Sequence, residues 1–256
     1  SQIFTNPGLQ MASFTITEKG YSLVDGKGSI LPAAAQDMEQ GTERPVSYIG
    51  KVAALLYARY QAGALPIAMV SMDNCSHNGD KLKAGVMAYV DAWKQAGKVD
   101  DDFVSYMEEK VSFPWSMIDK ITPRPDEKVK EMLEKDGFED TDLIITSRNT
   151  YTAPFVNSEE TGYLVIEDNF PNGRPPLEKA GIVFTDRETV DKVEKMKVCT
   201  CLNPLHTALA IYGCMLGHTS IHDEMEDKEL SQLIQKMWYE EAMPVVVNPG
   251  VIDPKE

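Results

Sequence analysis

Apolar and polar residues follow one another along the first part of the chain in patterns that predict a mixed α/β fold. Residues 9–18 alternate well enough to predict a β-strand. Residues 47–62 carry apolar side chains at helical spacing and are followed by Gly63, a common end of an amphipathic helix. A continuous apolar run of strand length comes next at 66–72, and residues 78–95 again show one apolar helical face. A helix, a glycine and then a buried strand are typical of an α/β sheet.

The second part of the chain becomes mostly helical. Two further strands are predicted at residues 143–146 and 162–167, and the proline-rich stretch 170–176 predicts a loop. From about residue 188 the chain is helix-prone and nearly free of proline. We therefore expect an α/β part over residues 1–187 and the first part of a helical domain over residues 188–256.

Composition and charge narrow the classes of partner. Hydrophobic residues make up 43% and charged residues 25%, as in soluble globular proteins, which excludes a disordered chain. The net charge of −15 and the absence of a concentrated basic segment argue against nucleic acid as a partner. No apolar run approaches the roughly 18 residues that would span a bilayer, so no membrane partner is expected. Four cysteines are too few for a disulfide scaffold, and we predict a cytoplasmic protein.

A lysine, an amide and an imidazole lie close together in the sequence where the helical part opens. Asn203 and His206 are three residues apart and would share a helix face, and Lys197 lies on the preceding turns. Such a set suits the interconversion of a secondary alcohol and a ketone, because the lysine can move the proton while the amide stabilises the oxyanion. Glu194 could accept or relay that proton. The alternative is structural, in that Asn203 and Pro204 merely begin a helix.

Two other segments carry polar residues of interest. Asp73 and Asn74 follow the apolar run 66–72, so they would lie at the carboxyl end of a buried strand, where ligands bind in open α/β sheets. Alternatively, these two residues cap the helix that follows. The stretch 113–123 contains Asp119 within a predicted turn and is by itself uninformative.

A metal site is a competing interpretation of the helical part. His206, Cys214, His218 and His222 would fall near one stripe of a single helix, and the last two have the i, i+4 spacing of zinc ligands. This pattern would indicate a metal-dependent hydrolase that uses His218 and His222. However, no glutamate follows the first histidine as in zinc peptidases, and nearby glycines interrupt the helix. Buried cysteine and surface histidines explain the pattern more simply.

Taken together, five motifs resemble those of the long-chain mannitol dehydrogenase family, which includes mannitol 2-dehydrogenase and fructuronate reductase (D-mannonate oxidoreductase). They occur in the order found in that family and extend over most of the chain. The motifs are TITEKGY (15–21), MDNCSHNG (72–79), FPWSMIDKITP (113–123), VIEDNFPNGRP (165–175) and the stretch from Lys197 to His206 that continues into HTALA.

The resemblance implies the second part of a Rossmann-like NAD-binding domain followed by a helical substrate domain. It also implies hydride transfer, without a metal, between NAD and a sugar-derived secondary alcohol or ketone. By the same resemblance, Lys197 is the general acid/base and Glu194 gates proton exchange with solvent. Asn74 and Asn203 form the oxyanion site, and His206 holds a substrate hydroxyl.

Substrate and cofactor contacts follow from the same resemblance. Asp119 orients the site, and Asp168 and Arg174 line it. Because Arg174 could pair with a substrate carboxylate, D-mannonate/D-fructuronate is favoured over D-mannitol/D-fructose. The implied cofactor contacts are Thr17, Glu18, Asp73 and Asn74.

The chain departs from the family pattern in spacing and in length. The family has five steps from the lysine to the asparagine, whereas Lys197 and Asn203 are six apart, and one residue rotates a helix by about 100°. The lysine therefore lies in a bulge or before the helix, or else has another role. Family members are about twice as long and carry a Gly-rich phosphate loop, of which this sequence has only a lone G-x-G at Gly26 and Gly28. We therefore expect an internal part of a longer member that binds NAD weakly by itself, and the alternative to an active enzyme is an inactive folded fragment.

Overall fold

The computed structural model of the protein describes residues 2–120, 122, 124–158 and 162–255. Within the chain, residues 1–117 and 164–256 form one unit and residues 118–163 form a second, smaller one. The larger unit contains a parallel sheet, a group of helices on one face of this sheet, and the helical C-terminal part. The boundary predicted at residue 187 lies inside the larger unit, at the start of a helix, and stays a prediction.

Three parallel strands form the first sheet, in the order β1 (Met11–Phe14), β2 (Ile67–Ser71) and β3 (Val111–Ser112). Met11 pairs with Ala68 and Phe14 with Ser71, so β1 and β2 end side by side. All five residues of β2 are buried, which explains why its sequence is a continuous apolar run. The predicted α/β class is confirmed.

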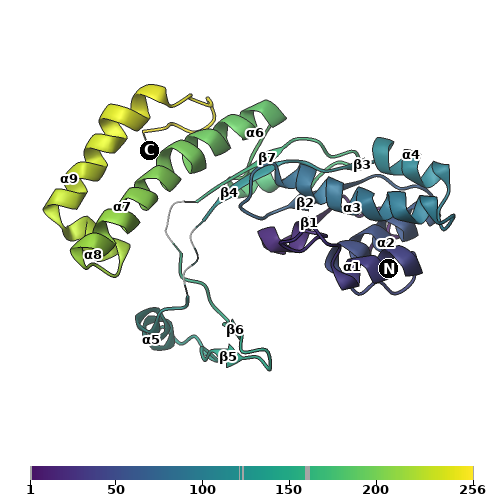
Figure 1. Cartoon of the computed structure of the whole chain (residues 1–256), viewed down its shortest axis with the longest axis horizontal. Helices are drawn as coiled ribbons and strands as arrows, with labels where there is room; N and C mark the ends of the chain where they lie inside the picture. The colour runs from purple at the N-terminus through teal and green to yellow at the C-terminus, as the bar shows by residue number, and fades with distance from the viewer. Residues whose placement is uncertain (1, 121, 123, 159–161, 256) are drawn as a thin grey trace. The chain divides into compact units, whose positions relative to one another are not determined.

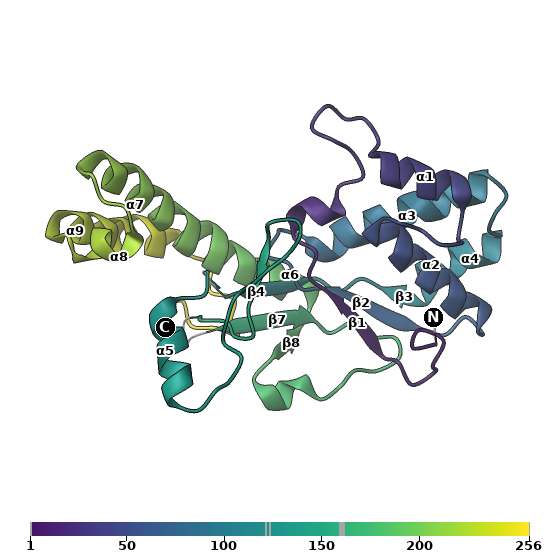
Figure 2. The ribbon, with the colours of Figure 1, turned by 90° about the horizontal axis from the view of Figure 1, so that it is seen from below.

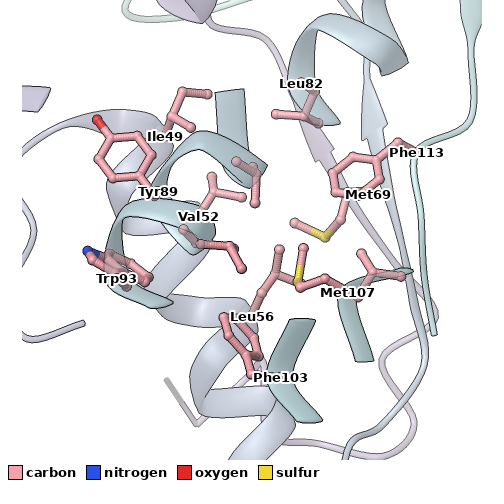
Figure 3. Close-up of a cluster of buried hydrophobic side chains, with 14 of the residues drawn as sticks. Ile49, Val52, Leu56, Met69, Leu82, Tyr89, Trp93, Phe103, Met107 and Phe113 are labelled. Carbon is pink, nitrogen blue, oxygen red and sulfur yellow. The ribbon is translucent and has the colours of Figure 1, made fainter. Parts of the chain in front are cut away.

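Helices cover one face of this sheet (Figure 1). They are α1 (Pro32–Gln40), α2 (Tyr48–Gln61), α3 (Asn78–Gln95) and α4 (Asp101–Glu109). Ile67 and Met69 of β2 point to these helices and join a core that includes Trp93 and Phe103 (Figure 3). The alternate residues of β2 point to the other face, as the two-residue period of a strand requires.

A second sheet packs on that other face of the first sheet. It consists of β4 (Ser116–Asp119), β7 (Tyr163–Glu167) and β8 (Val183–Thr185), and β7 and β8 run parallel (Figure 2). Ile166 of β7 is buried against Ala68 and Val70 of β2. The 3-10 helices η1 (Glu18–Tyr21) and η2 (Leu177–Ala180) follow β1 and precede β8.

The C-terminal part is built on one long helix, residues 187–216. It comprises α6 (Arg187–Glu194), the π-helical segment η3 (Lys195–Leu202) and α7 (Asn203–Leu216). Leu209 of α7 packs on Leu230 and Ile234 of α9. The remaining helices are α8 (Ile221–Glu226), α9 (Lys228–Lys236), η4 (Met237–Ala242) and η5 (Met243–Val245).

The long helix differs from the interrupted segment that the sequence led us to expect. By length and composition alone it is apolar enough to cross a membrane, with a mean hydropathy of 1.2 over its most apolar window, but core helices of soluble proteins pass the same test, and the expectation of no membrane partner stays a prediction. From the sequence, residues 199–216 are expected to be interrupted. In the structure the helix continues through Pro204, because this proline falls in the first turn of α7. Several large apolar side chains of α7 are exposed, namely Ile211, Tyr212, Met215 and Leu216.

The smaller unit contains one helix and one hairpin. Asp126 caps α5 (Glu127–Lys135) by accepting hydrogen bonds from two backbone N–H groups. β5 (Ile144–Ile145) and β6 (Tyr151–Thr152) pair antiparallel, so the strand predicted at 143–146 is confirmed in shorter form.

Candidate active site

A buried carboxylate joins the loops that follow β1 and β2. Asp73 is 6% exposed and accepts hydrogen bonds from the backbone N–H groups of Ile16 and Thr17, both at 2.9 Å. It also accepts one from the Tyr21 hydroxyl at 2.5 Å. Burial, together with the hydrogen bond to Asp73, raises the pKa of Tyr21 and keeps this hydroxyl protonated. Asp73 thus holds the predicted cofactor contacts Thr17 and Glu18 beside Asn74, but its own carboxylate is engaged within the protein.

The groups next to Asp73 are available to a ligand. Asn74 is exposed, and within the described part of the chain no hydrogen bond engages its carboxamide. Glu18 is exposed and forms a 3.2 Å ion pair with Lys81 at the surface. Thr17 has a φ of 62°, a left-handed value that is uncommon for a β-branched residue. The two backbone hydrogen bonds to Asp73 hold this segment in place.

Asn78, which sequence reasoning did not single out, connects three elements below this loop. It is fully buried, and its amide nitrogen lies 3.0 Å from the carbonyl oxygens of Asp73 and Ser116. Its amide oxygen accepts hydrogen bonds from the N–H groups of Gly79 and Ser116 at 2.8 and 3.0 Å. The signal that could have revealed it is an asparagine at the first position of a predicted helix, followed by a glycine. A Cβ on Gly79 would lie 2.5 Å from the carbonyl oxygen of Phe113, so only glycine allows this approach.

The loop after β2 also contacts the helix that carries the predicted lysine. The Ser76 hydroxyl donates a short hydrogen bond to the carboxylate of Glu194, which is 8% exposed. The neighbouring His77 places Nε2 3.2 Å from an oxygen of Asp191. Lys195, 2.6 Å from Asp191, is the main cause that lowers the pKa of this carboxyl, and His77 contributes. These contacts bring the loop with Asn74 to the end of α6, one turn before Lys197.

An aromatic stack strengthens the same contact. The ring of His77 lies parallel to the ring of Trp115, with centroids 4.1 Å apart, and the guanidinium of Arg187 lies 4.7 Å from the centroid of the Trp115 ring. Arg187 also forms ion pairs with Glu167 at 3.0 Å and with Asp80 at 3.3 Å. The beginning of α6 is thereby fixed to the end of β7 and to the first turn of α3.

The lysine lies in the π-helical segment, which accounts for its unusual spacing. π-Helical hydrogen bonds join residues five apart and absorb one extra residue into a helix, often at functional sites. Lys197 is half-buried within this segment, and Asn203 is the first residue of α7. Asn203 is exposed and His206 half-buried, and in the described residues no hydrogen bond or ion pair occupies either side chain. A bulge at the lysine, one of the explanations of the six-step spacing, is what the structure shows.

The structure places Arg174 and Asp168 away from this site. Asn172, two residues before Arg174, donates hydrogen bonds to the carbonyl oxygens of Pro7 and Leu9, which precede β1. Asn74, by contrast, follows the carboxyl end of β2, and β1 and β2 are parallel. The loop that carries Arg174 therefore lies at the opposite end of the sheet from Asn74.

The guanidinium of Arg174 is also occupied. It lies 2.8 Å from Asp168 and 2.6 Å from Glu178, and it stacks 3.6 Å from the centroid of the Phe184 ring. The hydrogen bond to Asp168 is the main cause that raises the pKa of Arg174. The expectation that Arg174 pairs with a substrate carboxylate stays a prediction, and in this structure the guanidinium is engaged within its own loop.

Two predictions remain, namely the role of Asp119 and the metal site formed by two histidines. The side chain of Asp119, in β4, lies outside the described residues. His218 lies 3.4 Å from Asp227, and His222 lies 3.6 Å from Glu226, so the two imidazoles face different carboxylates. Among the described residues no three potential ligands gather around one point, and nothing here favours the metal-dependent alternative.

Comparison with known proteins gives the class of protein that this fold and site define. Residues 5–179 match the family model of the mannitol dehydrogenase Rossmann domain, and the chain belongs to this family. Over its whole length it is 55% identical to D-mannonate oxidoreductase of Thermotoga maritima, of which it covers 48%. A mannitol dehydrogenase of Saccharomyces cerevisiae is 31% identical over 96% of the chain and 46% of the relative.

Solved structures agree with this assignment. A D-sorbitol dehydrogenase in substrate-free form superimposes with a TM-score of 0.78 and 27% identity. Mannitol 2-dehydrogenase of Pseudomonas fluorescens, in a ternary complex with NAD and D-mannitol, superimposes with a TM-score of 0.74 and 28% identity. Each match covers 98% of this chain and 48% of the other. The chain thus spans about half the length of the relatives it matches, and the Rossmann-like fold expected from its motifs is confirmed.

Proposed function

We propose that the protein is an NAD-dependent oxidoreductase that interconverts a sugar-derived secondary alcohol and its ketone, without a metal. The observation that carries this proposal is the contact between Ser76 and Glu194, which joins the loop of Asn74 to the helix of Lys197. D-mannonate/D-fructuronate is the preferred pair, with D-mannitol/D-fructose next. Because Arg174 is engaged elsewhere, this order now rests on the 55% identity to a D-mannonate oxidoreductase.

The residues present fit part of an NAD site. Open α/β sheets bind ligands beyond the carboxyl ends of their strands, and Thr17, Glu18 and Asn74 lie there beside one another. A carboxylate and a carboxamide at this edge suit the hydroxyl and amide groups of the cofactor. When bound, NAD would supply the acceptor or donor of hydride. We propose Asn74 and Glu18 as side-chain contacts, with Thr17 contributing through its constrained backbone.

In the proposed mechanism, a lysine and a glutamate move the proton, and two carboxamides and an imidazole hold the substrate. During alcohol oxidation the unprotonated amine of Lys197 accepts the hydroxyl proton of the substrate, and during ketone reduction the ammonium returns it. The carboxamides of Asn74 and Asn203 donate hydrogen bonds to the substrate oxygen as negative charge develops on it. Glu194 passes the proton between Lys197 and solvent, and His206 holds a second hydroxyl of the sugar.

We also propose a cytoplasmic location, where NAD-linked sugar metabolism takes place. All four cysteines are free, and none is paired with another among the described residues. Free cysteines at partly exposed positions are common in reducing compartments.

The test is NADH oxidation with D-fructuronate and with D-fructose side by side, in wild-type protein and in Lys197→Ala. We expect faster turnover of D-fructuronate and a loss of about 10²–10⁴-fold in kcat for the variant, since it removes the general acid/base. Lys192→Ala is the matched control, because Lys192 is partly exposed and pairs with Glu188 one turn earlier on the same helix, so its kcat should stay near wild type. No turnover of either sugar at any NADH concentration would favour the inactive-fragment alternative. Near-wild-type turnover in Lys197→Ala would refute the role of this lysine.

A further inference from the structure

Three side chains on one face of α6 contact the beginning of α3 and the loop before it. Arg187, Asp191 and Glu194 are separated by four and three residues, the spacing of a single helix face. Their partners are Asp80, His77 and Ser76 in the same order, so the chain after β2 runs backwards along α6. The hydrophobic neighbours Val190 and Val193 are fully buried, and α6 is therefore packed as well as hydrogen-bonded.

The last of these contacts is the one nearest the chemistry. Glu194 ends α6, and Lys197 follows three residues later inside the π-helical segment. On the other side of the contact, Ser76 lies two residues after the exposed Asn74. This hydrogen bond thus connects the two short segments that carry a proposed proton donor and a proposed oxyanion ligand.

His77 supports the same contact at a strained position. Its φ is 54°, a left-handed value for a residue with a side chain, and its ring is held between Trp115 and Asp191. The charged groups around the ring are Asp191 and Lys195 on α6, and Arg187 on the far side of Trp115. A strained residue fixed on two sides gives the loop one defined position.

We propose that Ser76 and His77 are positioning residues for Lys197. By holding Glu194 and Asp191 they fix the end of α6, so that the lysine meets the substrate oxygen bound by Asn74. This inference rests on the proposed function, since it assumes that Lys197 and Asn74 act on one substrate. Catalytic groups displaced by about 1 Å can lose about 10²-fold in rate, so a contact of this kind has a measurable kinetic effect.

The first test separates positioning from folding by kinetics. Ser76→Ala removes the hydroxyl, Ser76→Thr keeps it, and Ser105→Ala is a control that removes an exposed helical hydroxyl, which bonds the carbonyl of Asp101 one turn earlier. In Ser76→Ala we expect kcat to fall about 10-fold or more with the Kd for NADH unchanged, while the melting temperature falls only slightly because the Glu194 carboxylate loses one hydrogen bond. Ser76→Thr restores kcat, and Ser105→Ala has no effect.

The second test reports on the contact without turnover. Hydrogen–deuterium exchange of residues 187–202 is compared in wild type, Ser76→Ala and His77→Asn, since asparagine tolerates the left-handed backbone that His77 adopts. We expect faster exchange of this segment in both variants and unchanged exchange in α2.

The outcomes distinguish the inference from the proposed function. If the wild type is active and Ser76→Ala keeps its kcat, or if Ser76→Thr fails to restore a lost kcat, the positioning role is overturned and the proposed function stands. If the wild type turns over neither sugar, the proposed function fails, and hydrogen–deuterium exchange alone then tests whether Ser76 and His77 hold the end of α6. Unchanged exchange of residues 187–202 would then overturn the contact as well.

Discussion

Asn78 is the residue whose replacement should most directly separate the stability of the site from its chemistry. It is fully buried at the start of α3, beneath the loop that carries Asn74. Its amide group has two hydrogens and lies within hydrogen-bond distance of carbonyl oxygens of Ser71, Asp73 and Ser116. Its oxygen accepts from the N–H of Ser116 at 3.0 Å. Replacement by alanine removes these links and leaves buried backbone groups without partners.

The cost can be worked out from these contacts. Two donated bonds and one accepted bond join Asn78 to residues outside its own helix, and each contributes about 1 kcal/mol net. Buried backbone groups left without partners add to this cost, so Asn78→Ala should lower the free energy of unfolding by about 3 kcal/mol or more. Asn78→Asp keeps the shape but replaces the donors by a buried negative charge, which should cost about 3–5 kcal/mol at pH 7. Protonation of that aspartate would restore one donor, so its deficit should shrink as the pH is lowered.

The assay is urea unfolding followed by far-UV circular dichroism, with the midpoint and slope compared between variants. Asn74→Ala is the matched control, because it is an asparagine of the same motif that is exposed. We expect Asn74→Ala to change stability by less than about 0.5 kcal/mol while it lowers activity. A stability of Asn78→Ala within that same margin of wild type would refute the reasoning.

Three more predictions concern other parts of the larger unit. Arg59 is fully buried and donates five hydrogen bonds to backbone carbonyl oxygens, so Arg59→Met should destabilise by about 3 kcal/mol or more, with partial recovery in Arg59→Lys, as measured by urea unfolding. Gly79→Ala should lower the thermal midpoint by the equivalent of about 1–3 kcal/mol, whereas Gly85→Ala, whose Cβ would meet only ordinary contacts, should be neutral or stabilising; equal effects would contradict the steric argument. Because the pKa of Asp191 is lowered in the folded protein, its carboxylate stabilises the protein above about pH 4, and this contribution is lost as the pH falls below that value. Asp191→Asn should therefore be less stable than wild type at pH 7, and in acid-unfolding curves the difference should shrink as the pH falls below about 4 and through the lowered pKa of this carboxyl.

The fold of the α/β part could be predicted from the sequence where the hydrophobic period is strong. The helix expected at 78–95 and the strand expected at 66–72 match α3 and β2 almost residue for residue. The helices that were not predicted, α1, α4 and α5, are short, with nine residues each. In α5, for example, no described residue is buried, so its apolar positions mark no core. The strand expected at 9–18 shrinks to β1, because the chain beyond Phe14 turns to let Asp73 accept its backbone N–H groups.

The sequence names candidate residues of the site, but it does not show which of them contact one another. The motifs identified Asn74, Lys197 and Glu194, since such residues carry their chemistry in their side chains. Their long-range partners could not be predicted, because the contact between Ser76 and Glu194 spans 118 positions and depends on how α6 packs. The contacts of Arg174 likewise depend on how its own loop folds. Its chemistry suited a carboxylate ligand, but the nearest carboxylates belong to its own loop.

The π-helical segment accommodates the extra residue between Lys197 and Asn203, directly after the helix end that Ser76 contacts. An added residue in an α-helix would turn everything after it by about 100° and would carry either the lysine or the asparagine away from the site. In this protein the extra residue is absorbed between α6 and α7, and the Thr200 hydroxyl bonds the carbonyl of Lys195 five residues back, at 2.8 Å. Glu194 on one side and Asn203 on the other keep the regular geometry of their own helices. Lys197 lies in the remodelled stretch between them, where α-helical spacing no longer determines its direction, and the contact of Ser76 with Glu194 that we propose positions it lies one turn earlier.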